Sequence, residues 1–140
     1  VMDEVATHLL RVGFDDLRGS LDGGMDAWAM GGFPVARLST TSVHDLHKAL
    51  TSGGTTILDV RTDREWHAGH IDGALHIHGG LLEERFSEVP RDQPVAVVCG
   101  SGYRASIAAS FLKREQYSDV CNVIGGMSAW TAAGFPTTTL

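Results

Sequence analysis

The stretch CGSGYRAS, residues 99–106, holds residue types that can perform nucleophilic chemistry. It contains Cys99, one of the two cysteines in the chain, followed by two glycines, a serine and Arg104. Gly100 and Gly102 can adopt positive φ, so a tight loop here can turn several backbone N–H groups inward. Together with the dipole of a following helix, these groups would form an anion-binding site that stabilises a Cys99 thiolate. Arg104 would add positive charge within this site or brace the loop.

The length of this loop separates phosphorus chemistry from sulfur chemistry. Cysteine phosphatases hold phosphate with the pattern His-Cys-x5-Arg, whereas Cys99 and Arg104 are separated by four residues and Val98 precedes the cysteine. A smaller loop would enclose a smaller atom, such as a sulfur bound to the cysteine sulfur. The spacing therefore favours sulfur, and a phosphatase is the weaker alternative. Cys121, inside the apolar run VCNVI, is expected to be an inert core thiol.

Alternating apolar and helix-like segments must position this loop. We expect strands over residues 55–60, 74–77, 94–99 and 120–124, and helices over 43–52, 64–69, 80–86, 104–116 and 127–134. Ser42 is the expected N-cap of the first helix, and Ile107, Phe111 and Leu112 are expected to share the buried side of the fourth. The alternation indicates an α/β fold with a mostly parallel sheet and helices on both faces. Ligands of such sheets bind at the carboxyl ends of the strands, where the run PVAVV delivers Cys99.

The composition excludes several other classes of function. The chain has 140 residues, 43% of them hydrophobic and 20% charged, as expected for one globular domain. Its formal net charge of −6 argues against nucleic acid and anionic membrane surfaces as partners. No apolar run is long enough to span a membrane, and two cysteines provide no disulfide framework. We therefore expect a cytoplasmic protein without a membrane partner.

The chain also contains an internal repeat. Residues 23–34, GGMDAWAMGGFP, match residues 125–136, GGMSAWTAAGFP, and the segments before them also correspond. An offset of 102 residues is the length of a domain rather than of a solenoid repeat. We interpret residues 1–38 as the C-terminal remnant of a preceding domain, keeping a helix, a strand and a short helix, and residues 40–140 as a complete domain. Partners would then include upstream domains of the same chain, or a second copy in a homodimer.

Three separate stretches resemble the rhodanese family. They are LDVRTDREWHAGHIDGALHI, CGSGYRAS and GGMSAW, within a similarity that extends from residue 41 to residue 138. The resemblance implies a three-layer α/β/α fold with a mostly parallel five-stranded sheet. It implies a thiosulfate or persulfide sulfurtransferase without a cofactor, which moves a sulfane sulfur from a small-molecule donor to a thiol or other nucleophilic acceptor. By the same resemblance, Cys99 carries the sulfur, the backbone amides of residues Gly100, Ser101, Gly102, Tyr103 and Arg104 stabilise the persulfide, and Asp59 and Arg61 brace the surroundings of the loop.

Two departures from the family pattern affect the expected substrate. No lysine or arginine precedes Arg104 in the loop, so a persulfide is a better expected donor than the thiosulfate dianion. The common Arg-Ser ending is Arg104-Ala105 here, and Ser106 supplies the nearest hydroxyl. The alternative function is a non-enzymatic interaction or regulatory module of a larger enzyme, such as one with a metallo-β-lactamase-fold domain; the retained Cys99 counts against it. His67, His70, His76 and His78 could suggest zinc, but we expect no metal site, because His70 is explained by the Gly-His-Ile stretch.

Overall fold

The computed structural model describes residues 2–11 and 16–139. The chain divides into two compact units, Val1–Arg37 and Leu38–Leu140. None of the helices in the described ranges combines the length and the apolar character that crossing a membrane requires.

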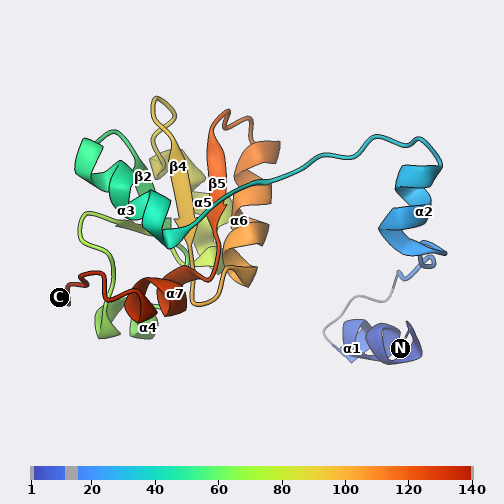
Figure 1. Cartoon of the computed structure of the whole chain (residues 1–140). Helices are drawn as coiled ribbons and strands as arrows, with labels where there is room; N and C mark the ends of the chain where they lie inside the picture. The colour runs from blue at the N-terminus through green and yellow to red at the C-terminus, as the bar shows by residue number, and fades with distance from the viewer. Residues whose placement is uncertain (1, 12–15, 140) are drawn as a thin grey trace. The chain divides into compact units, whose positions relative to one another are not determined.

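A five-stranded sheet forms the centre of the second unit (Figure 1). Its strands lie in the order β1-β5-β4-β2-β3, and every neighbouring pair is parallel. Their bounds are β1 Ser39–Thr41, β2 Thr56–Asp59, β3 Leu75–His76, β4 Val95–Val98 and β5 Val120–Val123. The expected α/β fold with a parallel sheet is confirmed.

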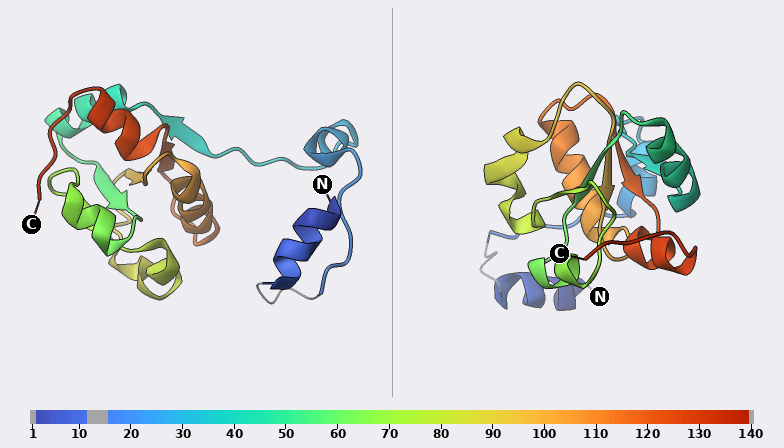
Figure 2. Two further views of the ribbon diagram at one scale, coloured as in Figure 1. Left: turned by 90° about the horizontal axis from the view of Figure 1, so that it is seen from below. Right: turned by 90° about the vertical axis from the view of Figure 1, so that its left-hand side faces the viewer.

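Helices cover both faces of this sheet and give the three layers (Figure 2). On one face lie α5, Leu82–Arg85, and α6, Tyr103–Arg114; on the other lie α3, Val43–Ser52, and α7, Gly126–Ala132. The remaining helical segments are α4, Asp63–Ala68, and the 3₁₀ turns η1, Gly79–Leu81, and η2, Phe86–Glu88. Ser42 caps α3 by accepting a hydrogen bond from the N–H of Asp45, as expected.

The central strand β4 shows why the sheet needs two helical layers. All four of its residues are buried, with Val95 and Val97 in one core cluster and Ala96 and Val98 in the other. A strand that is apolar on both sides is typical of parallel sheets whose two faces are covered. The carboxyl end of β4 therefore emerges between the two layers, and Cys99 is its next residue.

Three local expectations were wrong or incomplete. Ile107 is exposed on α6, because Ala105, Ala108, Ala109 and Leu112 form the buried side of that helix instead. Strand β1 was not anticipated; it has only three residues and forms by pairing with β5. Residues 16–22 form no strand, although the repeat predicts one there, since an isolated strand has no neighbour to hydrogen-bond with.

The first unit contains α1, Met2–Arg11, and α2, Gly24–Met30, and α2 repeats the local geometry of α7. Both helices have seven residues and follow a left-handed glycine, Gly23 or Gly125. In both, the indole N–H donates to a proline carbonyl 2.9 Å away, Trp28 to Pro34 and Trp130 to Pro136. The packing differs, because α2 has no buried residue whereas Trp130 is 1% exposed.

Candidate active site

The predicted nucleophile lies where β4 ends and α6 begins. Gly102, with φ of 102°, is the N-cap of α6 and turns the chain into the helix. The N–H of Gly102 donates to Cys99 Sγ at 3.1 Å, and the N–H of Ala105 donates to the same sulfur at 3.3 Å. Cys99 is only 1% exposed. Two backbone donors and the N-terminal end of α6 thus face a sulfur that little solvent reaches.

Helix α7 holds the loop by donating hydrogen bonds to two carbonyl oxygens of the loop. The N–H of Met127 donates to the carbonyl oxygen of Cys99 at 2.7 Å, and the N–H of Ser128 donates to that of Gly100 at 2.9 Å. Gly126 has φ of +52°, and a β-carbon there would overlap the backbone of Cys99 and Gly100. The first turn of α7 therefore draws two carbonyl groups away from the sulfur, which leaves the N–H groups facing it.

Arg104 braces the loop through an ion pair with Glu65. Its two Nη atoms donate to the two carboxylate oxygens at 2.8 and 2.7 Å. The hydrogen bond from Arg104 holds the pKa of Glu65 well below its usual range, and the same bond raises the pKa of Arg104. Glu65 also accepts hydrogen bonds from Thr62, whose side chain caps α4 in return. The pair joins the start of α6 to the start of α4.

Asp59 and Arg61 form a second, buried ion pair at the end of β2. Arg61 donates to both carboxylate oxygens of Asp59, with the shortest contact at 2.7 Å, and to the carbonyl oxygen of Gly69 at 2.8 Å. Within the described ranges, neither side chain hydrogen-bonds to the loop 99–104. Their contact with the loop is indirect, through the pairing of β2 with β4, in which Asp59 lies opposite Val98.

The surface around the sulfur carries little net positive charge. Tyr103 is 76% exposed, and Glu65 balances the only cation of the loop. Three of the four histidines considered for zinc have other partners: His70 and His76 both stack on Trp66, and His67 contacts the carbonyl oxygen of Asp63. No group of three or more potential metal ligands occurs in the part of the chain that the structure describes.

The structure brings most, but not all, of the sequence-predicted site residues together. Cys99, Gly102 and Arg104 lie as one loop, with Arg104 acting as the brace. Three contributions were missed: the carboxylate of Glu65, the N–H of Ala105 and the close packing of Gly126. Glu65 and Gly126 lie in the stretches that carry the family resemblance, but the spacing of those stretches says nothing about which residues touch. Cys121 lies on β5, and burial, with a smaller effect from Asp119, raises the pKa of its thiol.

Comparisons with known proteins agree with this geometry. Residues 42–133 match the family described as Rhodanese-like domain. Thiosulfate sulfurtransferase GlpE of Shewanella oneidensis is 33% identical over 92 residues, which cover 66% of this chain and 91% of that relative. YrkF of Bacillus subtilis is 39% identical over 75 residues, 54% of this chain, and the match spans only 40% of that protein's length. A rhodanese-related protein of Thermoplasma volcanium has a crystal structure with a TM-score of 0.68 and 29% identity, covering 73% of this chain and 99% of that one.

Proposed function

Because this chain belongs to the rhodanese-like domain family, we propose that it is a sulfurtransferase in which Cys99 carries a sulfane sulfur as a persulfide. The observation that carries the proposal is the pair of backbone N–H groups, from Gly102 and Ala105, that donate to the Cys99 sulfur. The similarity to a protein named thiosulfate sulfurtransferase supports sulfur transfer as the type of reaction.

The reaction consists of two displacements with no net oxidation. In the first, the Cys99 thiolate attacks the outer sulfur of a donor R–S–SH; the bond from Sγ to that sulfur forms, the donor S–S bond breaks, and R–S⁻ leaves. In the second, an acceptor thiolate R′–S⁻ attacks the outer sulfur of Cys99–S–SH, which yields R′–S–SH and regenerates the Cys99 thiolate. The N–H groups of Gly102 and Ala105 stabilise the charge that returns to Sγ in this second step. The N–H groups of Tyr103 and Arg104, in the first turn of α6 and without an intrahelical acceptor, are the proposed partners of the outer sulfur.

A persulfide is the proposed donor rather than thiosulfate. Thiosulfate is a dianion, and the one cation of the loop, Arg104, already has a bidentate carboxylate partner in Glu65. The most exposed side chain of the loop is that of Tyr103, and no lysine or second arginine stands in residues 99–104. The low exposure of Cys99 also favours a slender –S–SH group over a bulkier donor.

Intact mass measurement tests the proposal. After incubation with a persulfide donor, the protein is expected to gain the mass of one sulfur atom, and a thiol should remove it. Cys99→Ala should gain nothing, whereas Cys121→Ala, which removes the other cysteine, should load as the parent does. Absence of any adduct with persulfide and thiosulfate donors alike contradicts the proposal. Tyr103→Lys tests the choice of donor: it should raise kcat/KM for thiosulfate several-fold more than for a persulfide.

We further propose that residues 1–38 are the C-terminal part of a second rhodanese-like unit. The support is the matched geometry of α2 and α7, including the left-handed glycines and the indole-to-carbonyl hydrogen bonds. The N–H groups of Met127 and Ser128 hold the catalytic loop in the second copy, while no acceptor for those of Met25 and Asp26 occurs among the described residues. The coding sequence upstream of residue 1 in the genome tests the proposal directly. It should encode a second Cys-containing loop.

A further inference from the structure

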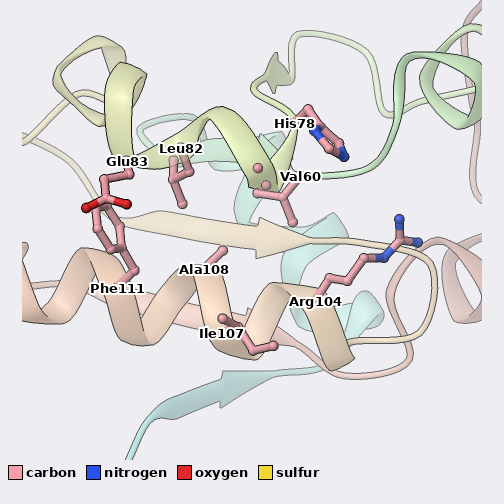
Figure 3. Close-up of a pocket in the computed structure, with 10 residues that line it drawn as sticks. Val60, His78, Leu82, Glu83, Arg104, Ile107, Ala108 and Phe111 are labelled. Carbon is pink, nitrogen blue, oxygen red and sulfur yellow. The ribbon is translucent and has the colours of Figure 1, made fainter. Parts of the chain in front are cut away.

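A cavity of about 450 Å³ lies beside the proposed catalytic loop, on the α6 face of the sheet (Figure 3). One wall is a stripe of α6 with helical spacing, formed by Arg104, Ile107, Ala108 and Phe111. The facing wall is formed by residues from the segment before η1 through the start of α5, namely His78, Gly79, Gly80, Leu82 and Glu83. This cavity is called the α6 groove below.

The α6 groove and the loop 99–104 share one residue, Arg104. The side chain of Arg104 lines the groove and also lies close to Gly100 of the loop. One of its Nη atoms would be 3.2 Å from a β-carbon added at position 100. Figure 3 shows Arg104 and His78 at one end of the groove and Glu83 and Phe111 at the other. Residues 104 and 111 are seven positions apart on the helix, so the groove extends roughly 10 Å from the loop. A molecule whose sulfur reaches Cys99 from this side would place its other end along the groove.

The walls of the α6 groove specify the character of that molecule. Ile107, in the middle, is 60% exposed, and Leu82, Ala108 and Phe111 provide further apolar surface. The one arginine in the lining is paired with Glu65. The far end carries the carboxylate of Glu83, which has no ion-pair partner among the residues that the structure describes. An anionic substituent would therefore meet negative charge without a compensating cation.

We propose that the α6 groove binds the carbon skeleton of the sulfur-exchanging thiol or persulfide, and that this skeleton is an unbranched aliphatic chain without a carboxylate. This inference rests on the proposed function for the identity of the reacting end, but the groove itself can be tested without it. In the bound complex the sulfur lies at the Arg104 end and the tail lies between Ile107 and Leu82. A tail that ends in an amine reaches Glu83.

Binding of unreactive probes tests the α6 groove independently of catalysis. Alkyl methyl sulfides with chains from ethyl to pentyl are titrated into the protein, and binding is followed by the NMR shifts of the Ile107 methyl groups. Affinity is expected to rise by up to about fourfold with each methylene, as the burial of a CH₂ group allows. A methyl sulfide of the same length as the pentyl probe, whose chain ends in a carboxylate, should bind at least tenfold more weakly than the pentyl probe. Equal affinities along the series, or no shift at Ile107, overturn the inference.

Two variants of α6 provide matched controls. Ala108→Leu places a larger side chain in the groove and should abolish the dependence on chain length, while Ser110→Leu adds the same group at an exposed position outside it and should not. Because Ala108→Leu also changes a buried position, Ile107→Ser, at an exposed position, is the second test. Binding to this variant is followed by the Leu82 methyl groups, which also line the groove, and pentyl affinity should fall at least tenfold. Sulfur loading of Cys99 is measured in parallel. If Cys99 loads with sulfur but probe affinity does not depend on chain length, the proposed role of the groove is contradicted and the proposed function is not. If probe affinity depends on chain length but Cys99 does not load, the role of the groove is supported and the proposed function is contradicted.

Discussion

Gly126 lies directly against the carbonyl oxygen of Cys99, so close that a β-carbon at position 126 has no room. The next N–H along the chain, that of Met127, donates to this oxygen. The first turn of α7 therefore binds the carbonyl groups of the loop 99–104, while N–H groups at the start of α6 bind the Cys99 sulfur. The loop owes its conformation to two helices that pack on opposite faces of the sheet.

Gly126→Ala should disrupt the site. The new methyl group must displace the backbone of Cys99 and Gly100, and the left-handed conformation is itself unfavourable for alanine, so we expect a loss of about 2–4 kcal/mol in unfolding free energy. Sulfur loading of Cys99 should fall at least tenfold. Denaturant titration and intact mass measurement provide the two readouts.

The repeat offers a matched control for this substitution. Gly24 has φ of +62° at the corresponding position of α2, and a β-carbon there meets nothing within 4 Å. Gly24→Ala should carry only the conformational cost, about 1–2 kcal/mol within the first unit, and should leave sulfur loading unchanged. Equal effects of the two substitutions on loading would contradict the role given to Gly126.

Much of this arrangement follows from patterns along the chain, and the rest depends on contacts across it. The apolar run before Cys99 and the glycines after it predict a loop at the end of a buried strand, and that prediction is confirmed. The partnership of Arg104 with Glu65 joins residues far apart in the sequence, and charge and spacing do not identify such a pair. Ile107 looks like a core residue by periodicity alone, but the alanines of α6 let the helix approach the sheet closely and leave the isoleucine outside.

The Glu65–Arg104 pair should make the stability of the folded protein depend on pH in the acid range. The pKa of Glu65 is lowered in the folded state, mainly by the hydrogen bond from Arg104, so the unfolded chain takes up the proton first as the pH falls. The stabilising contribution is therefore fully present above about pH 5 and declines as the pH falls below the unfolded value of about 4.3. The difference in unfolding free energy between the parent and Glu65→Gln should be constant above pH 5 and shrink below it. A difference that grows towards low pH would have the wrong sign.

The two tryptophans of the repeat should contribute unequally to stability. Both make the same indole hydrogen bond, but Trp130 is buried with Val43, Leu46 and Met127, whereas no residue of α2 is buried. Trp130→Ala should cost about 3–5 kcal/mol, as large-to-small substitutions of buried aromatic residues do. Trp28→Ala should leave the main unfolding midpoint unchanged. Calorimetry of both variants separates the packing contribution from the local hydrogen bond, and equal losses would contradict this assignment.

Cys121 should react with thiol reagents only at high pH in the folded protein. Burial is the main cause that raises the pKa of its thiol, and the neighbouring charge of Asp119 adds to it. In the Cys99→Ala variant, alkylation by iodoacetamide should therefore be slow at pH 8 and should accelerate only well above the ~8.5 at which a free thiol titrates. Because the folded pKa lies above the unfolded one, the unfolded chain loses its proton first, and Cys121 should lower stability as the pH rises past this value. Rapid labelling at pH 8 under native conditions, matching the rate in denaturant, would show that the thiol is not shielded on β5.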